Sequence, residues 1–127
     1  MDQLTNLLQG RRILVVEDDY ILALELVHGL ESVGVEIVGP VGKVADAMAR
    51  IAEGPRIDAA ILDIHLGTEK VFPVAEALLA RGVPFIFTTG YDISALPLNL
   101  AGIPLASKPV KVEDLMQRLV SEQDPNQ

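Results

Sequence analysis

The distribution of hydrophobic residues along the chain predicts alternating strands and helices. Five short apolar runs have the length of β-strands: RILVV at 12–16, VEIVG at 35–39, DAAILDI at 58–64, PFIFTT at 84–89 and IPLAS at 103–107. The third and fourth runs are apolar at nearly every position, as in strands that are covered on both faces of a sheet. Segments with helical periodicity lie between the runs, at 20–33, 43–53, 72–81 and 111–122.

This alternation predicts an α/β fold, a five-stranded parallel sheet with helices on both faces and right-handed crossovers. Gly34, Gly54 and Gly82 stand near helix ends as stop signals, and Pro73 fits the first turn of its helix. The segment GYDISALPLNLAG at 90–102 has no sustained apolar period and is interrupted by Pro97. We therefore expect the fourth of five helices to be short, irregular or replaced by a loop.

The helix predicted at 20–33 has two apolar faces. One stripe should face the sheet, and it consists of Leu22, Leu26, Leu30 and Val33. A largely separate face carries Ile21, Leu24 and Val27, and is more apolar than a solvated helix needs. Exposed apolar clusters often mark contacts with other proteins. The alternative is that the N-terminal segment covers this face with Leu4, Leu7 and Leu8.

Composition narrows the classes of protein that fit this pattern. A chain of 127 residues is expected to form a single domain, here 1–127 with an N-terminal extension at 1–10 and no effector domain. The net charge of −8 argues against binding to nucleic-acid phosphates, which leaves proteins, metal ions or small molecules as partners. No apolar run approaches the roughly 20 residues that cross a bilayer, and the N-terminus has the reverse charge order of a secretory signal. The absence of cysteine agrees with a cytoplasmic location.

Chemically active residues follow the predicted strands. Glu17, Asp18 and Asp19 come after the first, Asp63 ends the third, Thr88 and Thr89 end the fourth, and Lys108 and Pro109 follow the fifth. Functional groups gather beyond the carboxyl ends of parallel strands, so these residues should converge. Clustered carboxylates are tolerated around a hard cation such as Mg²⁺ or Mn²⁺. A carboxylate beside the cation can act as a nucleophile towards phosphorus, with Lys108 and a threonine hydroxyl as partners of the phosphoryl oxygens.

Each of these residues also has an ordinary structural interpretation. An aspartate after a strand often caps a helix, which fits Asp19 well. A threonine at a strand end suits a sheet, and Lys108 with Pro109 could be a surface turn. The joint occurrence of all four groups, in order and at the right strand ends, favours a functional site.

These motifs resemble the receiver domain of response regulators in bacterial two-component signalling, over about 12–122. ILVVEDD resembles the family's first acidic motif, which makes Glu17 and Asp18 metal ligands and places Asp19 just outside the site. ILDIHLG resembles the phosphoacceptor motif, which makes Asp63 the nucleophile and third carboxylate ligand and gives the metal the backbone carbonyl of His65. By the same resemblance, the His65 side chain lies over the site mouth.

The resemblance continues into the later strands. FTTGY implies Thr89 as the switch hydroxyl with the small residue Gly90 after it, and SKP implies Lys108 as phosphoryl ligand and a cis bond before Pro109. PFIFTTGY at 84–91 further resembles the PFxFATG[G/Y] stretch of single-domain response regulators, with Thr88 where alanine is usual. The family's aromatic switch residue is replaced by Leu105. We therefore expect output to pass through Gly90, Tyr91 and the irregular segment at 92–102.

The resemblance implies a signalling phosphoacceptor rather than a metabolic enzyme, with slow self-dephosphorylation. A histidine kinase or phosphotransfer protein would donate the phosphoryl group, and in receivers the helix at 20–33 typically docks that donor. Three alternatives stay open at this point. A degenerate receiver would bind partners without phosphorylation, and a flavodoxin-like cofactor binder would need a phosphate-binding loop after strand one. An aspartate-nucleophile phosphatase of the haloacid dehalogenase type would need aspartate where Glu17 stands.

Overall fold

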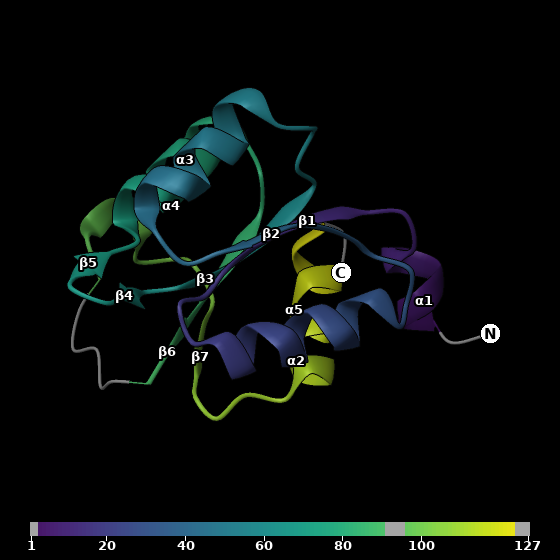
Figure 1. The fold of residues 1–127 in the computed structure, drawn as a ribbon. Coiled ribbons are helices and arrows are strands. Elements are labelled where there is room, and N and C mark those ends of the chain that lie inside the picture. Colours follow the sequence, from purple (N-terminus) through teal and green to yellow (C-terminus); the bar gives the residue numbers. More distant parts are fainter. Residues whose placement is uncertain (1–2, 91–95, 124–127) are drawn as a thin grey trace.

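Five parallel strands form the central sheet of the computed structural model, which describes residues 3–90 and 96–123 (Figure 1). Their order across the sheet is β2 (Glu36–Val41), β1 (Arg12–Val16), β3 (Ala59–Asp63), β6 (Phe85–Thr89) and β7 (Leu105–Ser107). The chain moves from β1 to one side for β2 and to the other side for β3. The strand order therefore reverses between β1 and β3, and a crevice at such a point is where open α/β sheets bind ligands.

Helices cover both faces of this sheet, as the sequence predicts (Figure 1). One face carries α3 (Val44–Glu53) and α4 (Phe72–Ala80). The other carries α1 (Gln3–Leu8), α2 (Tyr20–Glu31) and α5 (Val112–Gln123). Of the helices in the described ranges, none combines the length and the hydropathy needed to cross a membrane.

Alternation along the strands divides the core between the two faces. In β1, Ile13 and Val15 are buried on the α2 and α5 side, whereas Leu14 and Val16 are buried on the α3 and α4 side. The central strands β3 and β6 are buried at every residue, which explains their uninterrupted apolar sequence. The second face is closed by Leu26 and Leu30 of α2 and by Leu115 and Leu119 of α5.

The segment before β1 forms a helix that the sequence analysis treated only as an extension. Leu8 of α1 is fully buried in the core on the α2 and α5 side, and α1 packs against α5. The Gly10 amide donates to the Gly34 carbonyl at 2.8 Å, which ties this segment to the turn after α2. Gly34 has a φ of +85°, a left-handed conformation that suits glycine at a helix stop.

The stretch between β6 and β7 contains only a short 3-10 helix, η1 (Leu98–Leu100), among its described residues. This confirms that the fourth helix is short or irregular. Tyr91 and 92–95 lie outside the described residues. A two-stranded hairpin of β4 (His65–Leu66) and β5 (Glu69–Lys70) also follows β3, and the sequence pattern did not predict it. The structure has cis peptide bonds at Lys108–Pro109, as expected, and at Gly39–Pro40.

Candidate functional site

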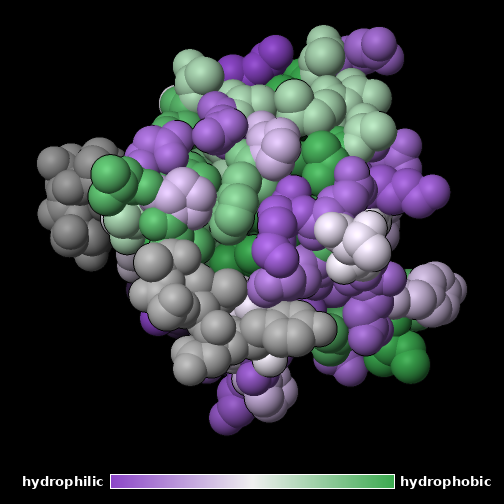
Figure 2. Space-filling view, turned by 90° about the vertical axis from the view of Figure 1, so that its left-hand side faces the viewer, coloured by the Kyte–Doolittle hydropathy of each residue, from purple (hydrophilic) through white to green (hydrophobic). Residues whose placement is uncertain are grey.

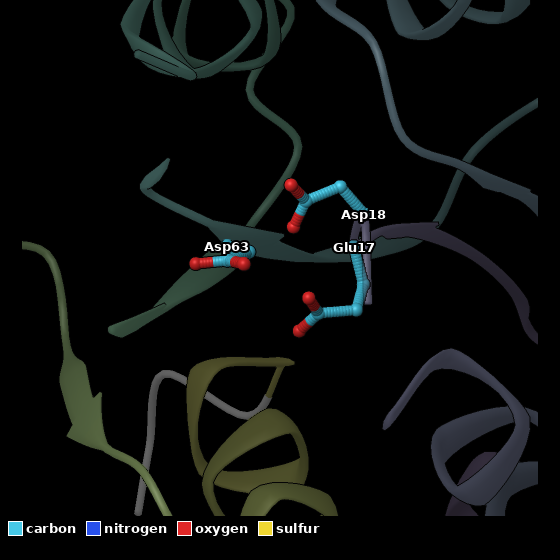
Figure 3. A group of neighbouring side chains, drawn as sticks. All are labelled: Glu17, Asp18 and Asp63. Atoms are coloured by element: carbon cyan, nitrogen blue, oxygen red, sulfur yellow. The ribbon is translucent and has the colours of Figure 1, made fainter. Parts of the chain in front are cut away.

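Three carboxylates meet at the carboxyl edge of the sheet. Each of Glu17, Asp18 and Asp63 offers an oxygen within 4.8 Å of the others, and Figure 3 shows the three side chains directed into one space. Glu17 and Asp63 are buried, whereas Asp18 is exposed. Hydrophilic residues gather across the middle and right of the face that carries β4, β5 and the end of β6 (Figure 2). The convergence of these acids was predicted from their positions after the strands.

The chain around Glu17 is held by hydrogen bonds from both sides. Its amide donates to the Val41 carbonyl at 2.9 Å, and its Oε2 accepts from the Asp19 amide at 3.1 Å. Asp19 in turn caps α2, because its Oδ1 accepts from the amides of Ile21 at 3.0 Å and Leu22 at 3.1 Å. Asp19 therefore has the structural role that its sequence position allows, and it holds the start of α2 beside the site.

Lys108 joins two of the three acids. Its Nζ lies 2.9 Å from Oε1 of Glu17 and 3.0 Å from Oδ2 of Asp63. The Lys108 amide donates to the Thr89 carbonyl at 2.7 Å, which fixes the backbone of the lysine to the end of β6. The cis bond to Pro109 follows directly. One ammonium group thus balances part of the charge of three carboxylates.

Burial and mutual proximity perturb these groups. Burial raises the pKa of Glu17 from 4.5 to about 7, and the neighbouring Asp63 side chain adds to the rise against the lowering effect of Lys108. For Lys108, burial lowers the pKa, but the bonds to Glu17 and Asp63 outweigh it and the pKa is raised overall. The lysine is therefore charged, and Glu17 gives up its proton reluctantly unless a further cation is present.

Two backbone amides of the loop after β3 donate hydrogen bonds to carboxylates of the site. The His65 amide donates to Oδ1 of Asp63 at 3.3 Å, and the Gly67 amide donates to Oδ2 of Asp18 at 2.8 Å. Gly67 has a φ of +62°, which glycine adopts without strain. Sequence reasoning missed Gly67 as a site residue; the glycine after ILDIHL was the available signal. The resulting cavity of about 230 Å³ is lined by Glu17, Asp18, Asp19, Asp63, His65, Gly67, Gly90 and Lys108.

Of the remaining predicted residues, Gly90 lines this cavity and others lie elsewhere on the molecule. Thr89 is buried at the end of β6, and Gly90 follows it and lines the cavity. Leu105 is half-buried at the start of β7 and packs on the α3 and α4 side. Ile21 and Leu24 are exposed on α2 with relative accessibilities of 66% and 47%, and Val27 is half-buried. The helix α1 packs against α5, and Leu8 is buried in the core instead of covering this face of α2.

The donor set fits a hard divalent cation. Mg²⁺ takes oxygen ligands at about 2.1 Å in octahedral geometry, which places neighbouring ligands about 3 to 4 Å apart. Carboxylate oxygens within 4.8 Å of one another are close to this spacing. Glu17, Asp18 and Asp63 could therefore hold such an ion, and its charge would offset the excess of acids over Lys108.

Comparison with solved structures identifies the family. SdrG from Sphingomonas melonis Fr1 is 40% identical over 89% of this chain and 95% of its own, with a TM-score of 0.74. The BeF3-activated conformation of SdrG from Pseudomonas melonis Fr1 is 39% identical over 98% of this chain and 100% of its own, with a TM-score of 0.72. A CheY-like response regulator receiver domain protein from Methanospirillum hungatei JF-1 is 27% identical over 92% and 98% of the two chains, with a TM-score of 0.77.

Two other comparisons gave no match, since neither a protein-family model nor a curated protein matches the sequence. The similar solved structures and the carboxylate site at the edge of the sheet lead to the same family. The chain belongs to the response-regulator receiver domains, the CheY-like family of two-component signalling.

Proposed function

We propose that this protein is a stand-alone response regulator that accepts a phosphoryl group on Asp63. The observation that carries the proposal is the position of Asp63, a buried carboxylate whose Oδ2 is 3.0 Å from Lys108 and which shares its space with Glu17 and Asp18. An isolated buried aspartate would be costly, and here its environment supplies a cation on one side and a second cation site on the other.

The reaction follows from what surrounds the carboxylate. An Asp63 oxygen attacks the phosphorus of a phosphohistidine on the donor protein. The new oxygen–phosphorus bond forms as the phosphorus–nitrogen bond breaks, and the departing imidazole keeps the electron pair and takes up a proton. Lys108 is placed to pair with a phosphoryl oxygen, and the Thr89 hydroxyl is proposed as a further donor to it. A bound Mg²⁺ or Mn²⁺ supplies neutralisation of phosphoryl charge during the transfer.

Glu17, Asp18, Asp63 and the His65 carbonyl are the proposed ligands of this cation. Glu17 and Asp18 lie beside Asp63, and the negative charge of these carboxylates repels an incoming phosphoryl group unless the cation is bound. This makes phosphorylation conditional on the metal. The proposal is supported by the short distances between the three carboxylates and by the likeness to SdrG, for which a BeF3-activated conformation has been solved.

The signal would leave through protein–protein contacts. A histidine kinase or phosphotransfer protein is the proposed donor, and it would dock on the exposed apolar face of α2 formed by Ile21, Leu24 and Val27, next to the site. Output would pass from Thr89 and Gly90 into Tyr91 and the irregular segment before β7. Leu105 stands where the family has an aromatic switch residue, and leucine cannot act as a hydrogen-bonding aromatic side chain. We further propose that the domain acts without an attached effector, as in the subgroup that the stretch at 84–91 resembles.

Incubation with a small phosphodonor tests the chemistry directly. The protein should gain the mass of one phosphoryl group when Mg²⁺ is present, and should stay unmodified when the metal is chelated. A chain that binds Mg²⁺ yet never gains this mass would be a degenerate receiver that works without phosphorylation.

A further inference from the structure

Thr88 occupies a position beside the phosphoacceptor that the proposed function leaves unused. It pairs with Asp63 in the register of β3 and β6 and with Ala106 in the register of β6 and β7. Thr88 follows Ile86 by two residues, so it lies on the face of the sheet covered by α2 and α5. The Thr88 side chain is 2% exposed. A polar residue therefore stands where the strand continues a hydrophobic row.

A small cavity connects Thr88 to Glu17 and Lys108, which form an ion pair with one another. The cavity has a volume of about 20 Å³ and lies between α2 and the segment after β7. Its polar lining comes from Thr88, Glu17, Lys108 and Glu25, and the rest is apolar, from Leu22, Leu26, Val110 and Val112. One water molecule needs roughly 10–15 Å³ and two to four polar partners. The cavity meets both conditions.

Thr88 is a buried polar residue that lines this cavity. Buried hydroxyl groups are almost always hydrogen-bonded, and in a cavity with a polar lining an ordered water can be the partner. Lys108 has a donor to spare, because an ammonium group has three N–H bonds and only two point at Glu17 and Asp63. A bridging water can satisfy both groups at once.

We propose that Thr88 is a positioning residue for Lys108, acting through one water molecule held in this cavity. The water accepts a hydrogen bond from the Lys108 ammonium and donates one to the Thr88 hydroxyl. Anchored from below, the ammonium stays at the level of Asp63 when Glu17 turns to a metal ion and when a phosphoryl group arrives. This inference rests on the proposed function, since it assigns a cause to the placement of the lysine that the transfer reaction uses.

Two substitutions at the same position separate the hydroxyl from the shape of the side chain. Thr88→Val keeps the branched shape and removes the hydroxyl, whereas Thr88→Ser keeps the hydroxyl and removes a methyl group. With saturating Mg²⁺ and a small phosphodonor, Thr88→Val should phosphorylate Asp63 about two- to tenfold more slowly, and Thr88→Ser should retain the wild-type rate. The ¹⁵N signal of the Lys108 ammonium should shift in the valine protein and stay in place in the serine protein.

The two variants also keep the inference distinct from the function on which it rests. If wild-type protein is not phosphorylated at all, the proposed function fails. If wild type is phosphorylated and Thr88→Val matches it in both rate and Lys108 signal, the positioning role is wrong. Equal slowing by valine and serine would likewise overturn it, because packing and not the hydroxyl would then be responsible.

Discussion

The Lys108 ammonium nitrogen lies 3.0 Å from Oδ2 of Asp63, although the two residues are 45 positions apart in the chain. The same nitrogen lies 2.9 Å from Oε1 of Glu17. A single cation thus holds two buried acids together, while Asp18 lies beside them and accepts a hydrogen bond from the Gly67 amide. The site carries more negative charge than its own lysine can neutralise. Its stability and its reactivity should therefore both depend on an added cation.

The excess of negative charge at the site should appear in how the free energy of unfolding of the metal-free protein depends on pH. Glu17 has a pKa of about 7 in the folded protein against an ordinary value of 4.5, so between these pH values the folded state holds a proton that the unfolded state has lost. The free energy of unfolding should consequently fall as pH rises through this window, by about 1 to 3 kcal/mol. Glu17→Gln should remove that slope and stabilise the metal-free protein at pH 8.

Urea denaturation at half-unit pH steps, with a chelator present, measures the effect. Glu36→Gln is the matched control, because Glu36 is exposed and pairs with Arg12 on the surface. A slope that persists unchanged in Glu17→Gln, or disappears equally in Glu36→Gln, would mean that Glu17 is not the group responsible.

Metal affinity should depend on Asp18 more than on its neighbour Asp19. In Asp18→Asn the amide oxygen can still accept from Gly67, so the loop after β3 should keep its place while one ligand charge is lost. Asp19→Asn also removes a charge near the site but preserves the cap of α2, since asparagine caps helices as well as aspartate does. Calorimetric titration with Mg²⁺ should show at least a tenfold loss of affinity for Asp18→Asn and a smaller loss for Asp19→Asn. Equal losses would indicate a general field effect in place of ligation.

The exposed face of α2 should serve the phosphodonor protein and not the chemistry. Leu24→Glu should slow transfer from a phosphotransfer protein or kinase while leaving labelling by a small phosphodonor unchanged, because the substitution charges an apolar contact without touching Asp63. Leu79→Glu offers a matched control, since Leu79 is 43% exposed on α4, on the opposite face of the sheet from α2. If Leu24→Glu changes neither protein-dependent transfer nor oligomeric state, this face does not dock the donor.

The switch should run along the chain after β6. Addition of beryllofluoride, a phosphoryl mimic, should shift amide signals throughout 89–102. Thr89→Ala should leave Asp63 phosphorylatable but uncouple it from partner binding, because it removes the hydroxyl that we propose as a donor to the phosphoryl group. Leu105→Ala should mainly lower stability, by about 1 to 3 kcal/mol, since Leu105 is half-buried against the core. Signal changes confined to the surroundings of Asp63 would contradict this route.

The sequence predicted the site because its residues follow strands whose ends must meet. Asp63 after a fully apolar run, and Lys108 before a proline, are local signals, and parallel topology alone brings them together. The same reasoning placed the sheet, its covering helices and the irregular segment containing Pro97. Asp19 could be interpreted as a cap or as a site residue, and only the hydrogen bonds to Ile21 and Leu22 show that it caps.

Features that depend on packing between distant segments could not be predicted. The helix α1 is only six residues long and gains its stability from burying Leu8 against α5, which no local pattern specifies. The bond between Gly67 and Asp18 depends on how the short hairpin of β4 and β5 folds back over the site. The cavity beneath Lys108 arises from α2, β6 and the segment after β7 together. The sequence shows Thr88 at the end of a strand, but it does not show which residues surround its side chain in space.

The most direct test of the central claim compares wild-type protein with Asp63→Asn by intact mass spectrometry after incubation with Mg²⁺ and a small phosphodonor. Asparagine keeps the shape of the side chain and a hydrogen-bond acceptor for Lys108, but removes the nucleophilic carboxylate. Wild-type protein should gain one phosphoryl group, and Asp63→Asn should gain none. Labelling of Asp63→Asn to the wild-type level would show that the phosphoryl group resides elsewhere and would contradict the assignment.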